Sequence, residues 1–108
     1  MRFSFPALGA AALLALAAPA PAAPAPVTVK IANFTFDSAV VSVAPGTTVT
    51  WVNEDDIPHT IVADNKGFRS KVLDTGERFS FTFAAAGTYG YFCSIHPHMT
   101  GRIVVKAS

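Results

Sequence analysis

Apolar and polar side chains alternate with a period of two along most of the chain after residue 26. Alternate residues of a strand face opposite sides of a sheet, so this pattern predicts strands. The clearest predicted strands are 27–32, 48–51, 79–83, 89–93 and 101–106. The only helix-tolerant patch is Ala84-Ala85-Ala86, which Gly87 ends. The pattern predicts an all-β protein, an antiparallel β-sandwich or barrel.

The first residues have the features of a secretory signal. Arg2 precedes an apolar run, 7–18, that is too short to span a bilayer. Small residues follow it, and we expect cleavage between Ala22 and Ala23 because proline disfavours the neighbouring sites. No twin arginine precedes the run and no cysteine ends it, which favours general secretion without a lipid anchor. A membrane-tethering helix is the alternative.

The predicted organisation is therefore a signal peptide (1–22), a Pro-rich lead-in (23–26) and one domain (27–108). The predicted location is periplasmic or secreted, without membrane insertion of the mature domain. The chain has eight Lys and Arg against seven Asp and Glu. Because Arg2 would be lost with the signal, the mature domain would be neutral. Such a domain has no electrostatic feature that favours nucleic acid or an anionic membrane.

Four side chains carry the candidate chemistry: His59, Cys93, His96 and Met99. They offer two imidazoles, a thiolate and a thioether, which is the donor set of a mononuclear blue-copper site. Cys93 is the only cysteine, so it forms no internal disulfide. It shares a strand face with Tyr89 and would point inward at the strand end. His59 must then come from the end of the strand that contains Trp51 or from the start of the next.

Other interpretations of these residues agree less well with the sequence. Structural zinc sites favour more Cys or His and rarely use Met. A Cys–His catalytic pair needs an orienting residue and an oxyanion hole, and would leave Met99 unexplained. A copper enzyme needs further copper ions, but the chain has three histidines, and only His98 remains. Each residue alone could be ordinary core or loop. The four together favour copper and a protein that is not an enzyme.

The segment 87–99 (GTYGYFCSIHPHM) and the segment 49–53 (VTWVN), followed by Pro58-His59, resemble the cupredoxin family. The likeness is strongest to its amicyanin, pseudoazurin and plastocyanin group and covers nearly the whole predicted domain. It implies a Greek-key β-sandwich of seven or eight strands. It also implies one copper ion, cycling between Cu(I) and Cu(II), on His59, Cys93, His96 and Met99. By the same likeness, Tyr89 is a tyrosine corner.

Two departures from the family pattern concern the surroundings of the copper rather than its ligands. Thr60 stands where many relatives have an asparagine that braces the cysteine loop, and a hydroxyl has fewer donors than an amide. His98 stands where related proteins tend to have phenylalanine, which makes the expected docking surface around His96 less apolar.

The sequence thus predicts an exported, monomeric blue-copper protein that passes single electrons between larger redox partner proteins. A copper carrier or buffer with the same ligands is the rival hypothesis. An accessory domain of an oxidase complex is a third.

Overall fold

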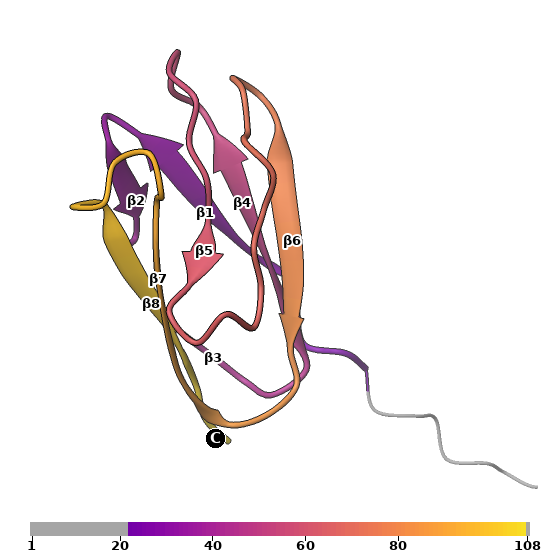
Figure 1. The fold of residues 1–108 in the computed structure, drawn as a ribbon. Coiled ribbons are helices and arrows are strands. Elements are labelled where there is room, and N and C mark those ends of the chain that lie inside the picture. Colours follow the sequence, from indigo (N-terminus) through magenta and orange to yellow (C-terminus); the bar gives the residue numbers. More distant parts are fainter. Residues whose placement is uncertain (1–21, 108) are drawn as a thin grey trace, which may run out of the picture.

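Two β-sheets of four strands each pack face to face in the computed structural model, which describes residues 22–107. The described residues contain no helix. Figure 1 shows the two layers and the loops that cap them at either end. The strands are β1 (Val27–Ala32), β2 (Thr35–Asp37), β3 (Val40–Val43), β4 (Thr47–Asn53), β5 (Val62–Ala63), β6 (Arg78–Phe83), β7 (Gly87–Phe92) and β8 (Thr100–Val105). The predicted signal peptide lies outside the described residues except for Ala22.

Each sheet contains one parallel pair, which differs from the expected antiparallel arrangement. The first sheet has the order β2-β1-β4-β6, and β1 runs parallel to β4. The second has the order β3-β8-β7-β5, and β3 runs parallel to β8. Both parallel pairs join strands that are distant in the sequence. A period-two pattern reports which face of a strand is buried, but not which strand it pairs with.

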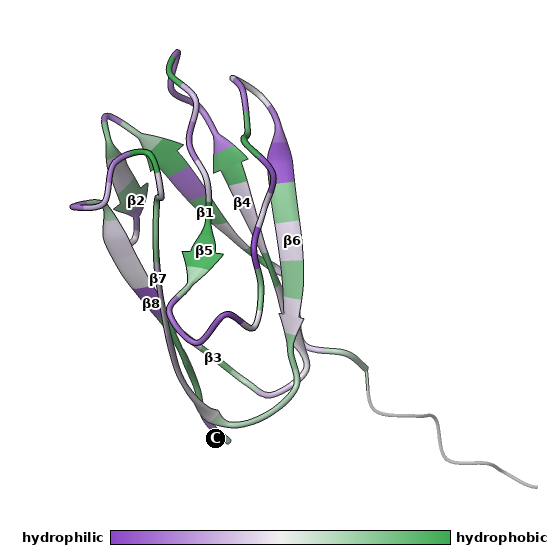
Figure 2. Cartoon of the chain, viewed as in Figure 1, coloured by the Kyte–Doolittle hydropathy of each residue, from purple (hydrophilic) through white to green (hydrophobic). Residues whose placement is uncertain are grey.

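The inward faces of both sheets form one core. Alternate residues of β1, Val29 and Ile31, are fully buried, as is Trp51 of β4. Trp51 packs at ring-centroid distances of 5.2 Å from Tyr91 and 6.0 Å from Phe68, so its ring lies inside this core. Along β6 the alternation of apolar and polar residues appears as bands in Figure 2. The predicted strands are therefore real, and their apolar faces meet.

Tyr89 forms the predicted tyrosine corner. Its hydroxyl donates a 2.7 Å hydrogen bond to the carbonyl oxygen of Ala85, in the turn that leads into β7. By contrast, the hydroxyl of Tyr91 is buried without a hydrogen-bond partner among the described residues. The two tyrosines lie two residues apart on the same strand and form a natural pair for comparison.

We expect Tyr89→Phe to lower the free energy of unfolding by about 1 kcal/mol, the usual net value of one such hydrogen bond. Tyr91→Phe is the matched control and should cost less, because it removes a hydroxyl that makes no hydrogen bond to residues 22–107. Urea titrations of the three proteins measure the difference. Equal losses for both variants would contradict the assignment of a stabilising role to the Tyr89 hydroxyl.

Candidate metal centre

Three of the four predicted ligands converge at one end of the sandwich. One donor atom each from His59, Cys93 and His96 lies within 4.8 Å of the others. Nδ1 of His59 is 3.8 Å and Nδ1 of His96 is 3.7 Å from Sγ of Cys93. Bonds to a divalent ion of roughly 2.0 Å from nitrogen and roughly 2.3 Å from sulfur, in a trigonal plane, would separate the two atoms by roughly 3.8 Å. The two sulfur–nitrogen distances therefore suit binding of one ion between these side chains.

The loop between β7 and β8 positions Cys93, His96 and Met99. The N–H of His96 donates to the carbonyl of Cys93 (3.2 Å), and the N–H of Met99 donates to the carbonyl of His96 (2.8 Å). The N–H of Cys93 donates back to the carbonyl of Met99 at 3.1 Å, which closes the loop. Met99 is 5% exposed, so its thioether belongs to the protein interior. The spacing of three residues between ligands thus corresponds to two successive turns.

His59 lies in the long connection between β4 and β5, rather than at the end of β4 or the start of β5 as the sequence analysis expected. Its backbone pairs with Leu73 through two hydrogen bonds of 3.1 and 2.8 Å, in an isolated bridge outside the named strands. Its side chain is fully buried. The ligand is therefore fixed from the backbone, although it does not lie in a strand.

Thr60 braces the cysteine loop from the next position along this connection. Its hydroxyl accepts the N–H of Ser94 at 2.7 Å and lies 2.8 Å from the Ser94 hydroxyl. Its N–H points at Sγ of Cys93 at 3.4 Å, and its Oγ1 is 3.7 Å from the same sulfur. The residue that departs from the family pattern thus still ties the two halves of the site together.

The Cys93 thiol ionises more readily than an ordinary cysteine, because its pKa is lowered. Burial by itself opposes the thiolate, but the N–H of Thr60, the imidazole of His59 and other hydrogen bonds outweigh it and lower the pKa of Cys93 to about 6. A thiolate is the form of cysteine that binds metal. The protein therefore prepares the sulfur for a soft or borderline ion before the ion arrives.

This shift predicts a pH dependence of the metal-free protein. The pKa of Cys93 is about 6 when folded, below the value of about 8.5 expected when unfolded. Ionisation therefore favours folding: the contribution is complete above about pH 8.5 and is lost as the pH falls through about 6. Urea titrations of wild type and Cys93→Ser across this range measure it. The same pH slope in both proteins would contradict the prediction.

Asp55 also contacts the site, a contact that the sequence pattern does not predict. One carboxylate oxygen lies 2.8 Å from Nε2 of His59. The carboxylate also accepts the N–H groups of Asn33 (2.9 Å) and Phe34 (3.0 Å). These bonds, the one from Phe34 first, lower the pKa of Asp55 although its partial burial opposes this. The signal available in the sequence was a carboxylate four residues before a ligand histidine.

Two exposed apolar side chains lie next to His96, Phe34 through a ring contact and Ile95 as its neighbour in the chain. The ring of Phe34 meets the rings of His96 and His59 edge-on, at centroid distances of 5.0 and 5.8 Å. Phe34 is 44% exposed and Ile95 is 45% exposed. His96 is half-buried, and His98 is exposed, as expected for a solvated loop residue.

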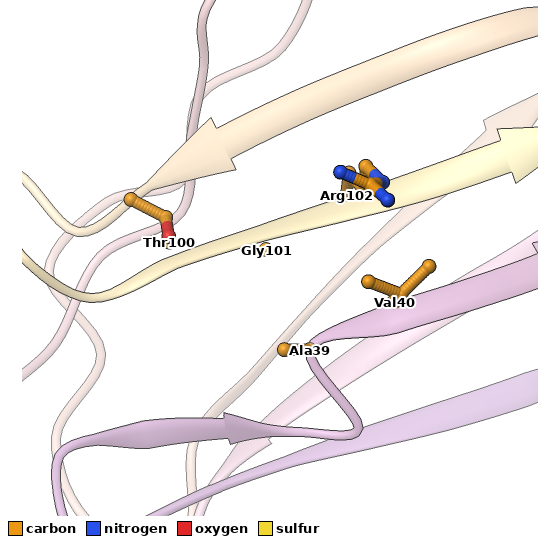
Figure 3. A pocket seen from close by; sticks show the side chains of 5 residues that line it. All are labelled: Ala39, Val40, Thr100, Gly101 and Arg102. Atoms are coloured by element: carbon orange, nitrogen blue, oxygen red, sulfur yellow. The ribbon is translucent and has the colours of Figure 1, made fainter.

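A shallow hollow lies elsewhere, between β3 and β8 (Figure 3). It is lined by Ala39, Val40, Thr100, Gly101 and Arg102. None of these is a predicted ligand, and the N–H of Arg102 is bonded to the carbonyl of Ala39 across it at 2.8 Å. This hollow is therefore distinct from the cluster of predicted ligands.

Residues 23–106 match the family model described as copper binding proteins, plastocyanin/azurin family. The chain belongs to this family. The cofactor is accordingly copper, and the all-β sandwich is that of a cupredoxin. Among the described residues, no helix is long and apolar enough to cross a membrane.

Several members of the plastocyanin/azurin family are similar in sequence. Amicyanin-alpha of Methylorubrum extorquens is 34% identical over 108 residues, covering 95% of this chain and 91% of that protein. Amicyanin of Paracoccus denitrificans is 33% identical over 85 residues, or 74% of this chain and 65% of that protein. Plastocyanin of Scenedesmus fuscus is 39% identical over 84 residues, or 66% of this chain and 86% of that protein. This chain thus spans just under two thirds of one amicyanin and nearly all of another.

Solved structures agree with this assignment. A purple cupredoxin from Nitrosopumilus maritimus is similar with a TM-score of 0.71 at 32% identity, covering 74% of this chain and 99% of that one. A copper-containing nitrite reductase from Thermus scotoductus reaches 0.71 at 40% identity, but the match covers only 23% of that chain. The likeness to the enzyme is therefore limited to a domain of it.

Proposed function

We propose that this protein transfers single electrons through one copper ion held by His59, Cys93, His96 and Met99. The observation that carries the proposal is the convergence of two imidazole nitrogens on one buried sulfur, at 3.7 and 3.8 Å. The relatives named amicyanin and plastocyanin support it. Copper in such a donor set supplies a reversible one-electron couple.

The surrounding residues suit this role. Two nitrogens favour the oxidised ion and a thiolate with a thioether favours the reduced one, so the donor set accommodates both. The ligands are held by backbone hydrogen bonds of the loop and by the bridge from His59 to Leu73. A scaffold that keeps its ligands in place lowers the reorganisation needed when an electron arrives or leaves. Burial of His59, Cys93 and Met99 also excludes water.

We propose that electrons enter and leave at His96. It is the predicted ligand that reaches the surface, since the other three are at most 5% exposed. Phe34 and Ile95 flank it with apolar surface. Such a patch lets a larger redox protein approach the imidazole without trapping water or unpaired charge. The proposed location is periplasmic or secreted, and the proposed state is a monomer.

Visible spectroscopy and voltammetry of the copper-loaded domain test the proposal. We expect an intense blue band from the sulfur-to-copper charge transfer, and a reversible one-electron wave. The rival role of a copper carrier predicts rapid loss of copper to a competing chelator and slow electron exchange. A colourless protein without a reversible wave would contradict electron transfer.

A further inference from the structure

The turn between β1 and β2 has an unusual conformation. Asn33 and Phe34 both have positive φ, 53° and 58°. Two such residues between paired strands form a type I′ turn, which normally requires Asn-Gly or a similar pair. A bulky side chain such as that of Phe34 is strained there. Something outside the hairpin must therefore stabilise the turn.

The carboxylate of Asp55 supplies that stabilisation. It accepts the N–H of Asn33 at 2.9 Å and that of Phe34 at 3.0 Å, one on each oxygen. Hydrogen bonds to an ionised acceptor are stronger than those between neutral groups. These contacts hold the turn in a conformation that its own sequence disfavours. The turn between β1 and β2 lies at the same end of the molecule as the loop between β7 and β8 (Figure 1), and Phe34 of the turn contacts His96 of that loop.

The same carboxylate also holds a ligand. Oδ2 lies 2.8 Å from Nε2 of His59, whose side chain is fully buried, while Asp55 is 14% exposed. An ionised carboxylate can only accept, so Nε2 must carry the hydrogen. Nδ1, which faces Cys93 at 3.8 Å, is then the atom free to bind copper. A carboxylate in this position also makes the imidazole a stronger donor.

Phe34 connects these two roles. Its ring meets the ring of His96 at 5.0 Å and that of His59 at 5.8 Å, with interplanar angles of 88° and 85°. The positively polarised edge of one ring thus meets the face of another, a favoured arrangement. The position of this ring depends on the turn, and the turn depends on Asp55.

We propose that Asp55 is a positioning residue of the copper site. Its carboxylate fixes the tautomer and donor strength of His59 and, through the turn, keeps the ring of Phe34 against both ligand imidazoles. This inference rests on the proposed electron-transfer function. It assigns a role to the middle residue of the acidic segment Glu54-Asp55-Asp56, which by sequence alone resembles a solvated turn.

Asp55→Asn keeps the shape of the side chain but removes its charge and one acceptor. An anionic neighbour and a strong imidazole donor stabilise Cu(II) more than Cu(I). Removing the charge of Asp55 should therefore favour Cu(I). We expect the ratio of Cu(I) to Cu(II) at a fixed applied potential to rise about tenfold. This corresponds to an increase in reduction potential of about 59 mV for a one-electron couple. We also expect Cu(II) affinity to fall by about 10–100-fold. Asp56→Asn is the matched control, since it removes the same charge from the adjacent exposed residue.

A second measurement needs no copper. In the metal-free protein, hydrogen exchange at the amides of Asn33 and Phe34 should be about tenfold faster in Asp55→Asn than in Asp56→Asn. Equal potentials in the two variants would overturn the inference while leaving the electron-transfer proposal intact. If the copper-loaded wild type has no blue band, the electron-transfer proposal fails. The role of Asp55 is tested separately in the metal-free protein, where equal amide exchange in the two variants would overturn it.

Should Asp55→Asn fail to fold, the comparison is repeated in a Phe34→Gly background. Glycine adopts the positive φ without strain, so the turn no longer needs the carboxylate. The contact between Asp55 and His59 remains in this background. The potential should therefore still shift when Asp55 is replaced, and an unchanged potential would overturn the inference.

Discussion

Replacing Cys93 by alanine is expected to abolish the intense visible band and the reversible electron exchange of the copper-loaded protein. The thiolate is the donor from which the charge-transfer band arises, and Cys93 is the only cysteine in the chain. No other soft anionic donor is available to replace it. The side chain is fully buried, so external thiols cannot substitute easily. We expect the affinity of the variant for Cu(I) to fall by several orders of magnitude.

The loop contains its own control. His98→Ala changes an exposed histidine five residues from Cys93 and should leave the band intact, whereas His96→Ala should weaken or remove it. Absorption spectra after titration with Cu(II), together with dialysis against a chelator, measure both effects. A blue band that survives in Cys93→Ala, or one that His98→Ala removes, would show that the ligands are assigned wrongly.

Replacing Trp51 by alanine is expected to cost about 3–5 kcal/mol of unfolding free energy, the usual range for a large buried aromatic side chain. Trp51 is fully buried and contacts Phe68, Phe79, Phe83 and Tyr91 at centroid distances of 5.2–6.4 Å. The total free energy of unfolding of a small domain is about 5–15 kcal/mol. The variant should therefore lie close to unfolding at room temperature.

Urea titrations followed by circular dichroism measure this loss, because tryptophan fluorescence is no longer available. Trp51→Phe should cost much less, since it keeps an aromatic ring in the same space. Val72→Ala, at a residue that is 50% exposed, should change stability by less than about 0.5 kcal/mol. A loss in Trp51→Ala no larger than in Val72→Ala would contradict the central place of this ring in the core.

Most strands and the three candidate ligands of the loop could be predicted because both depend on local spacing. Cys93 ends one predicted strand and His96 and Met99 follow at intervals of three residues, and alternation reports the buried face of each strand. The short strands β2 and β3 were not predicted, since each contributes only one buried side chain, Phe36 and Val43. The parallel pairs could not be predicted either, because they join segments far apart in the chain.

The role of Asp55 escaped prediction for a different physical reason. In sequence it is one of three successive acidic residues, and a solvated turn explains such a segment well. The three hydrogen bonds of its carboxylate reach to the β1–β2 turn, more than twenty residues away, and to His59. The conformation of Phe34 escaped for the same reason, since propensity alone would place glycine there. Tertiary contacts overrode local preference at both positions.

The central place of β8 has a consequence for how the protein matures. β8 lies between β3 and β7 in the second sheet, and Met99 directly precedes it. During synthesis, a chain that still lacks this strand leaves β3 and β7 with unpaired edges. Such edges promote aggregation. Folding dominated by pairings between distant segments is also slow. The chain is therefore expected to remain unfolded, and unable to hold its ion, until its last strand has emerged.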